Sequence, residues 1–284
     1  MTTYGVETFP DLSFKAGTDL ELALDLYLPT PRPANCPTLV YFHGGAWARG
    51  SRTDYAQERI LPVVRNGVAV ASASYRLIDQ AIWPAQLNDA AAAVKFVISI
   101  TGRFGLDPRR VGVWGASAGG HLACMLVLAS PVRELISGAV AWFPPTDLTT
   151  LETDPKPEHY VLPDFMRGQW ARPTFHLDLV GGRDVATNQR LRQASPLHHI
   201  NGAAKPIFLL HGDQDPLVPP DQSERFHRKL VEHGTDASFE VVIGATHEDP
   251  EFSKARILES VATFIKNLEP LLDTGLSEKV VRGE

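Results

Sequence analysis

The sequence predicts an α/β fold in which helices cover a mostly parallel β-sheet. Short, continuous apolar runs recur along the 284 residues, and each ends in small or polar residues. Continuous apolar runs are typical of strands that are buried on both faces of a sheet. The runs are Thr38–Phe42, Val68–Ser74, Val111–Trp114, Ala139–Phe143 and Ile207–Leu210. Helical patterns lie between these runs, and such alternation favours an α/β layer fold.

One further strand is indicated before this series and one after it. Leucines occupy every second position of Leu20–Leu28, which is the period of a strand with one buried face. Phe239–Ile243 is the last apolar run that we interpret as a strand. The helices are predicted at Tyr55–Asn66, Gln86–Ile100, Ser117–Ala129, Asp221–His233 and Glu251–Leu268.

Local residues mark where several of these helices begin and end. Gly67 and Gly234 stand just past two of them, at the position where glycine commonly ends a helix. Asp221 is predicted as an N-cap. Ser117–Ala129 is apolar nearly all round, so we expect this helix to be buried.

The segment Thr149–Ala194 breaks the alternation. It has no clear strand, and it is too long for an ordinary connection between two elements. We interpret it as a cap-like insertion over one end of the sheet, because it holds too few apolar residues for a core of its own. Residues 1–284 are therefore predicted to form a single domain with an insertion or lid at about 149–194.

Composition and charge narrow the class of protein. The net charge is −6, whereas a nucleic-acid-binding protein normally carries a basic face. No apolar run reaches the ~18 residues that a membrane helix requires, and Met1–Phe9 shows no signal-peptide pattern. Cys36 and Cys124 lack zinc-like spacing, so we expect buried free thiols. These observations predict a cytoplasmic protein with neither nucleic-acid nor membrane partners.

The strongest chemical signal is a Gly-x-Ser-x-Gly motif at Gly115–Gly119. It lies between a predicted strand and a predicted helix, which is the context of a nucleophile elbow. In that tight turn the serine takes a strained conformation, and the glycines avoid clashes with the strand and the helix. Ser117 is therefore predicted as a nucleophile, and the amide of Ala118 as an oxyanion donor at the helix N-terminus. The alternative is a helix start whose small residues merely pack against a strand.

A second motif, His43–Trp47, follows the Thr38–Phe42 strand and has the sequence His-Gly-Gly-Ala-Trp. Loops of this kind supply the other half of an oxyanion hole, because side chains there would block the substrate oxygen. We assign the donors to Gly45 and Ala46 and expect His43 to orient the loop. Trp47 is interpreted as a wall of the substrate pocket, although plain packing explains it nearly as well.

A serine nucleophile needs a base, and the base needs an acid that orients it. Asp213 and Asp215 both follow the Ile207–Leu210 strand. Asp215 lies deeper in the loop and is the predicted acid, whereas Asp213 is expected to tie the turn. His247 follows the next strand, and one helix and one strand separate it from Asp215. Because adjacent crossover units place both loops at the same sheet edge, His247 is the predicted base.

The other histidines are interpreted as structural. His121 shares a rigid helix with Ser117, so its ring does not easily reach the serine oxygen. His198 and His199 are expected at the surface or in a loop. His159 and His176 lie in the insertion, where surface placement is preferred over substrate contact. A metal site built from His43, His211 and His247 has no supporting ligand spacing, so no metal is expected.

Together these motifs resemble the α/β-hydrolase superfamily. The details are similar to its hormone-sensitive-lipase-like branch and, more closely, to the small esterase group of feruloyl-esterase-like proteins and kynurenine formamidases. The stretches that carry the resemblance are His43–Trp47, Ser74–Leu77, Trp83–Gln86, Asp89, Gly115–Ala123, Ala194–Leu197, His211–Pro219 and Gln222–Ser223. Ala46 stands where the lipase-like pattern has a third glycine, and the His-Gly-Gly-x-Trp form is that of the second group.

The resemblance implies a mostly parallel sheet of about eight strands with helices on both faces, and Ser117, Asp215 and His247 as a triad that needs no cofactor. The leading hypothesis is a carboxylesterase acting on small to medium esters through an acyl-enzyme. An arylformamidase that cleaves an N-formyl group shares every motif and stays open. A noncatalytic binding protein on the same scaffold is the alternative from another class. Trp83 and Phe143 are expected to shape the pocket together with Trp47, and a monomer and a homodimer are equally compatible with the sequence.

Overall fold

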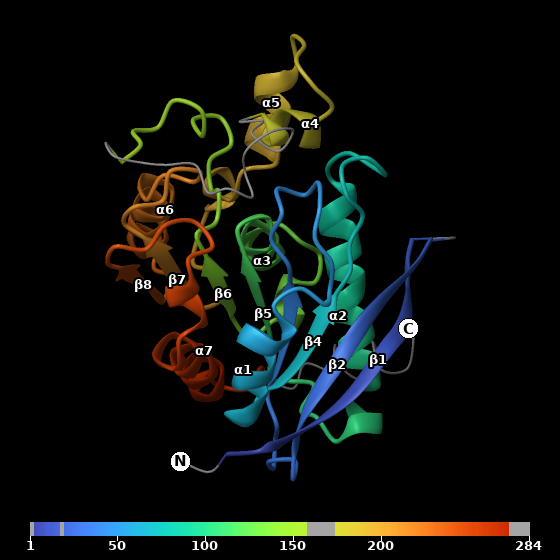
Figure 1. Ribbon diagram of the computed structural model, residues 1–284. Coiled ribbons are helices and arrows are strands. Elements are labelled where there is room, and N and C mark those ends of the chain that lie inside the picture. The colour runs from blue at the N-terminus through green and yellow to red at the C-terminus, as the bar shows by residue number, and fades with distance from the viewer. Residues whose placement is uncertain (1–2, 18–19, 158–173, 273–284) are drawn as a thin grey trace.

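A computed structural model describes residues 3–17, 20–157 and 174–272. Its centre is an eight-stranded sheet in the order β1-β2-β4-β3-β5-β6-β7-β8 (Figure 1). The strands are β1 (Gly5–Ala16), β2 (Leu20–Thr30), β3 (Thr38–Phe42), β4 (Ala69–Ala73), β5 (Val111–Ala116), β6 (Ala139–Trp142), β7 (Ile207–Gly212) and β8 (Ala237–Val242). Strand β2 pairs antiparallel with β1 and β4, and every pairing from β4 to β8 is parallel. The predicted α/β class and mostly parallel sheet are therefore confirmed.

Helices cover both faces of this sheet. They are α1 (Leu61–Arg65), α2 (Ala85–Phe104), α3 (Ala118–Leu128), α4 (Phe175–Leu179), α5 (Thr187–Gln193), α6 (Asp221–Glu232) and α7 (Ala255–Asn267). Side chains alternate across β3, so Val40 and Phe42 pack with α2 and α3, while Leu39 and Tyr41 pack with α1 and α7. The period-two geometry of a strand thus divides the core into two layers.

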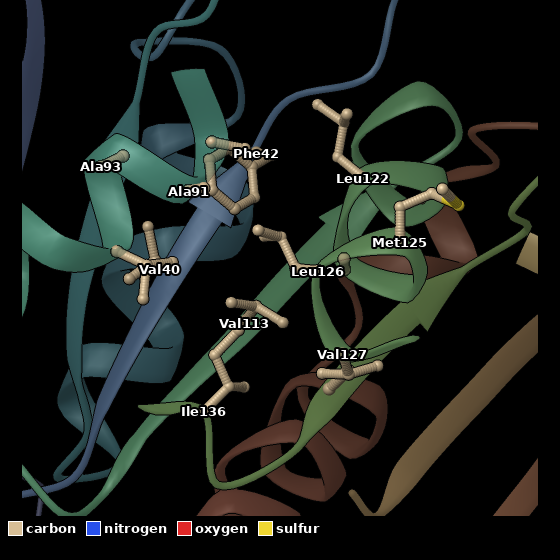
Figure 2. Close-up of a cluster of buried hydrophobic side chains, with 14 of the residues drawn as sticks. Val40, Phe42, Ala91, Ala93, Val113, Leu122, Met125, Leu126, Val127 and Ile136 are labelled. Atoms are coloured by element: carbon tan, nitrogen blue, oxygen red, sulfur yellow. The ribbon is translucent and has the colours of Figure 1, made fainter. Parts of the chain in front are cut away.

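The layer beneath α3 is densely apolar (Figure 2). Every residue of α3 is buried, as its all-round apolar sequence predicts. Leu122 and Leu126 project toward β3 and β5, where Phe42 and Val113 meet them. Full burial of one leucine contributes about 1.5–3 kcal/mol to stability. This packing fixes the helix that begins directly after Ser117.

Strand β1 was not among the predicted elements. Most of its side chains are exposed or half-buried, so its sequence has little of the apolar periodicity on which strand prediction depends. It also contains Pro10, and its register with β2 shifts between Phe9 and Leu12. An edge strand tolerates both features, because one side of its backbone makes no ladder hydrogen bonds.

Several helix boundaries differ from the prediction. The predicted helix Tyr55–Asn66 begins as a π-helix at Ala56–Ile60 before it continues as α1. Asp221 is the first residue of α6 rather than its N-cap, because Pro220 takes that position. The final helix is preceded by a separate 3₁₀ turn at Pro250–Ser253, which ends at the extended residue Lys254.

The predictions for two glycines and the two cysteines are confirmed. Gly67 and Gly234 have φ angles of 83° and 81° and follow the ends of α1 and α6. Cys36 and Cys124 are buried free thiols. Within the described ranges, no helix is long and apolar enough to cross a membrane.

The segment interpreted as an insertion contains two short helices, α4 and α5, in its described part. Figure 1 shows them beyond the end of the sheet at which β5 and β6 terminate. At the base of this segment, the amide of Leu148 donates to Ser195 Oγ over 2.8 Å. The two ends of the segment are thereby joined next to the sheet.

Candidate active site

Ser117 occupies the turn between β5 and α3. Its φ and ψ angles are 53° and −116°, a strained conformation for a residue that carries a β-carbon. A β-carbon on Gly119 would lie 1.9 Å from the carbonyl oxygen of Phe42, and one on Gly115 would lie 2.2 Å from the carbonyl carbon of Gly119. Both glycines are therefore required by close backbone approach, and the turn places Ser117 at the wall of a cavity at the carboxyl end of β5.

Ser117, His247 and Asp215 form a continuous line of hydrogen bonds. The Nε2 atom of His247 lies 2.9 Å from Ser117 Oγ, and its Nδ1 atom lies 2.6 Å from Asp215 Oδ2. Asp215 follows β7 and His247 follows β8, and these strands are parallel neighbours. Their carboxyl ends therefore meet at one edge, as the crossover argument predicts. All three residues are buried.

Further hydrogen bonds hold the carboxylate of Asp215. Its Oδ1 atom accepts from the amides of Leu217 and Val218 at 2.9 and 3.0 Å. Its Oδ2 atom lies 3.2 Å from His211 Nε2, which also donates to the carbonyl of Val218. Ser223 Oγ lies 2.7 Å from the other ring nitrogen of His211, so contacts on both nitrogens fix the orientation of this ring.

The electrostatic interaction between Asp215 and His247 favours a charged carboxylate and a basic histidine. Burial raises the pKa of Asp215, but His247 and His211 outweigh it and hold the pKa well below its usual range. Burial lowers the pKa of His247, yet the negative charge of Asp215 outweighs this and raises the pKa above 6.5. His247 is thus a stronger base than a free imidazole, which is what proton removal from a serine demands.

The loop after β3 lies on the other side of Ser117. Gly45, Ala46 and Trp47 all have positive φ angles, of 115°, 55° and 57°. The Nδ1 atom of His43 donates to the carbonyl of Gly44 at 2.7 Å, and Tyr75 donates to the carbonyl of His43. His43 thus lies inside the loop and stiffens it, as its predicted orienting role requires.

A cavity of about 110 Å³ opens at Ser117. The oxyanion candidates Gly45, Ala46 and Ala118 all border it. Its other lining residues are Trp47, Arg49, Ser117, Pro145, Leu151, Phe175, His176, Leu217, Val218, His247 and Glu248. Most of the lining is apolar, and Leu151 and Phe175 belong to the segment predicted as an insertion.

Two of the predicted pocket residues do not border this cavity in the described part of the chain. Trp83 packs edge-on against His121, with ring centroids 5.2 Å apart. Phe143 is fully buried behind the site, where its ring lies 4.7 Å from that of His247. Trp83 and Phe143 were expected to shape the pocket, but the sequence does not show where a ring points. Trp47 does line the cavity.

The histidines and the second aspartate are distributed largely as expected. His121 is fully buried and donates to the carbonyl of Ala194 at 2.6 Å, and burial lowers its pKa to about 4. Asp213 accepts from the amide of Gly244 and so ties the turn after β8. His176 was wrongly expected at the surface: its exposed fraction is 3%, and it borders the cavity.

The remaining candidates give no further ligand site. His198 and His199 lie on a short 3₁₀ turn, and His198 pairs with Asp147 at 3.3 Å. His159 lies outside the described residues. The described ranges contain no group of three or more His, Cys, Asp or Glu side chains that could hold a metal ion.

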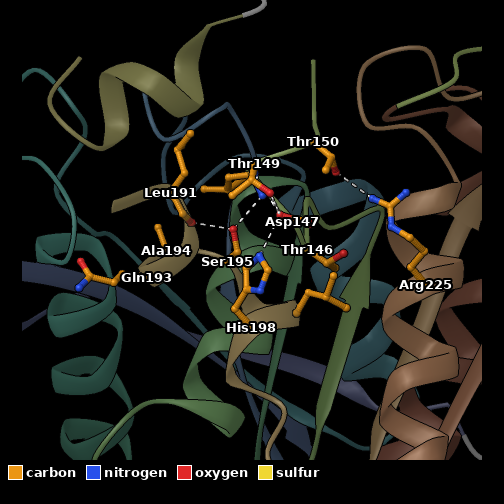
Figure 3. Close-up of polar contacts among 12 residues, drawn as sticks. Thr146, Asp147, Thr149, Thr150, Leu191, Gln193, Ala194, Ser195, His198 and Arg225 are labelled. Atoms are coloured by element: carbon orange, nitrogen blue, oxygen red, sulfur yellow. Dashed lines mark hydrogen bonds and ion pairs between the residues drawn. The ribbon is translucent and has the colours of Figure 1, made fainter. Parts of the chain in front are cut away.

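A polar network anchors the segment that contains Leu151 (Figure 3). Gln222 Oε1 accepts from the amides of Thr146 and Asp147 at 2.8 and 2.7 Å. Arg225 pairs with Asp154 at 2.7 Å and also donates to Thr150 Oγ1. The cavity wall is therefore tied to α6, the helix that follows the Asp215 loop.

Several polar residues of the site were not found by sequence reasoning. His211 contacts the Asp215 carboxylate, and Glu248 borders the cavity beside His247. Arg59 reaches Glu248 from the π-helix before α1. The position of Glu248 directly after His247 was a usable signal for that residue, but nothing local in the sequence marks Arg59.

This fold, with a serine on the strand–helix turn and an aspartate and a histidine after the last two strands, defines an α/β-hydrolase. The chain belongs to the BD-FAE family, whose model matches residues 24–230. The resemblance inferred from the motifs is therefore confirmed.

Individual relatives support the same placement. The chain is 27% identical over 231 residues to isoprenylcysteine alpha-carbonyl methylesterase ICME of Arabidopsis thaliana, covering 80% of this chain and 53% of the relative. It is 27% identical over 208 residues to esterase LipQ of Mycobacterium tuberculosis, covering 70% of this chain and 46% of the relative. It thus spans about half the length of these curated relatives. A truncated carbohydrate esterase from gut microbiota has the same fold, with a TM-score of 0.78 and 23% identity. The match covers 93% of this chain and 96% of that structure.

Proposed function

We propose that the protein is a serine carboxylesterase that hydrolyses small to medium carboxylic esters. The observation that carries this proposal is the unbroken line from Ser117 Oγ through His247 to Asp215 at the wall of a cavity. Relatives named as esterases and methylesterases support the same reaction class.

The geometry assigns a role to each group. His247 Nε2 accepts the proton of Ser117 as Oγ attacks the carbonyl carbon of the ester. The negative charge that develops on the carbonyl oxygen lies against the amides of Ala118 and the Gly45–Ala46 loop. His247 then passes its proton to the leaving alcohol, and water hydrolyses the acyl-enzyme by the same steps. Asp215 fixes the ring and stabilises the imidazolium.

The size and lining of the cavity support a preference for short acyl groups. Its volume is about 110 Å³, which is small compared with the ~300–1,000 Å³ of drug-sized ligand sites. Trp47, Leu151 and Phe175 give it apolar walls. We therefore propose that turnover is greatest for short acyl chains and decreases as the chain outgrows these walls.

The test is hydrolysis of p-nitrophenyl esters from acetate to decanoate by the wild type and by Ser117→Ala. Turnover of short esters that disappears in the variant supports the proposal. N-formylkynurenine is assayed in parallel, and a higher kcat/KM for this formamide would replace the esterase assignment with an arylformamidase. If an organophosphate fails to label Ser117, the serine is not an activated nucleophile and the enzymatic proposal is wrong.

A further inference from the structure

The residue that follows His247 has an unfavourable backbone conformation. Glu248 has a φ angle of 57°, in the left-handed region that a side chain with a β-carbon disfavours. Such a conformation persists only when the surrounding structure holds it in place. The contacts of Glu248 therefore show what fixes the loop that carries His247.

One arginine holds this loop at two points. Glu248 Oε2 lies 2.7 Å from Arg59 Nη2, and the two side chains are 10% and 1% exposed. The Nε atom of Arg59 donates to Ser253 Oγ at 3.3 Å. Arg59 itself lies over the ring of Tyr55, with 3.8 Å between the guanidinium carbon and the ring centroid. The planar guanidinium thus connects the residue after His247 to the turn that ends the same loop.

The position of Arg59 depends on an unusual stretch of helix. It belongs to the π-helix Ala56–Ile60, in which the amide of Ile60 donates to the carbonyl of Tyr55. Isolated π-helical turns are frequent at functional sites. Here the turn directs a cation toward the buried edge of the site, although the sequence predicts an ordinary α-helix.

The other oxygen of Glu248 faces the oxyanion loop. A β-carbon on Gly44 would lie 2.6 Å from Glu248 Oε1, so the carboxylate packs directly against the backbone of that glycine. Glu248 also borders the cavity that contains Ser117. The ion pair therefore contacts both the loop of the base and the loop of the oxyanion donors.

We propose that Arg59 and Glu248 are positioning residues, whose buried ion pair holds the His247 loop against the oxyanion loop and so keeps the base aligned with Ser117. This inference rests on the proposed esterase function. Removing the pair allows the ring of His247 to shift relative to Ser117, and small misplacements of a catalytic group reduce turnover strongly.

The titratable groups around the pair provide an independent readout. Tyr41, Tyr55, His43 and His247 all interact electrostatically with Glu248. Burial lowers the pKa of His247, Asp215 raises it most, Glu248 raises it further, and Arg59 opposes them. Removal of the Glu248 charge is thus expected to move the acid limb of kcat/KM to lower pH.

The experiment compares Glu248→Gln and Arg59→Lys with Asp107→Asn. Asp107 is the control, because its carboxylate is similarly buried and pairs at 3.2 Å with the more exposed Arg109, but it precedes the far end of β5. Turnover is normalised to the fraction of Ser117 that an organophosphate labels, so unfolded protein does not contribute.

We expect both site variants to lower kcat on the order of 10- to 100-fold with little change in KM, since alignment of the base acts on the transition state. Arg59→Lys keeps the charge but loses the two-point contact, so it lowers kcat without the pH shift of Glu248→Gln. Site variants that match Asp107→Asn in kcat and in pH profile would overturn the inference while leaving Ser117-dependent turnover intact. If the wild type shows no Ser117-dependent ester hydrolysis, the proposed function is wrong, and so is the inference that rests on it.

Discussion

Ser117 and His247 face each other across 2.9 Å, yet different interactions hold the elements that carry them. The serine lies between a buried strand and the fully buried helix α3, and two glycines permit the close backbone approach. The histidine and Asp215 lie on loops that polar contacts hold, from His211, from backbone amides and from the Arg59–Glu248 pair.

This difference separates two kinds of constraint in one site. Apolar packing and glycines determine where the nucleophile is, and changing them alters the fold. Charge and hydrogen bonding determine where the base is and how basic it is, and changing them alters turnover even where the protein stays folded. The predictions below test that division, from the largest expected effect to the smallest.

Replacing the carboxylate on the base side should have the largest effect on turnover. We expect Asp215→Asn to lower kcat by about 10⁴-fold, because the amide no longer selects the correct tautomer of His247. Asp213→Asn is the control on the same loop, since the Asp213 carboxylate accepts from the amide of Gly244. Steady-state kinetics on a short ester measures both. Equal losses in the two variants would contradict the assignment of Asp215.

On the nucleophile side, Gly119→Ala should reduce stability as well as activity. The added β-carbon meets the backbone carbonyl of Phe42 at 1.9 Å, so we expect a loss of about 3 kcal/mol or more in the free energy of unfolding. Gly102→Ala in α2 is the control, because nothing lies within 4 Å of its β-carbon, and it should gain about 0.5–1 kcal/mol. Denaturant unfolding measures both, and similar stabilities would show that the elbow is not limited by backbone approach.

The pH profile reports on the base side alone. His247 must be neutral to accept the proton of Ser117, and Asp215 raises its pKa above 6.5. Activity should therefore be lost as the pH falls through a value above 6.5, at which the imidazole becomes protonated. The acid limb of kcat/KM measures that value for the free enzyme. A limb below pH 6.5 would show that burial outweighs the Asp215 charge.

The sequence predicts the nucleophile side better than the base side for a physical reason. A short motif marks the elbow, because the glycines that the tight turn requires lie within a few positions of Ser117. The acid and the base were found from chain order and strand spacing, but Arg59 is far from Glu248 in the sequence, and only the fold brings them together. Strand β1 was missed because its mostly exposed sequence lacks apolar periodicity. The ring directions of Trp83 and Phe143 were missed because they depend on long-range packing.

The smallest expected effect concerns the wall of the cavity. Leu151 borders the cavity, and the Arg225–Asp154 pair holds its segment. Leu151→Ala should therefore shift the acyl preference toward longer chains by on the order of 10-fold, since one or two methylenes in an apolar pocket are worth that much discrimination. Val185→Ala is the control in the same segment, because Val185 is fully exposed. The ratio of kcat/KM for butyrate and octanoate esters measures the shift. An unchanged ratio in Leu151→Ala would mean that the acyl chain lies elsewhere and that the aromatic walls, Trp47 and Phe175, set its length instead.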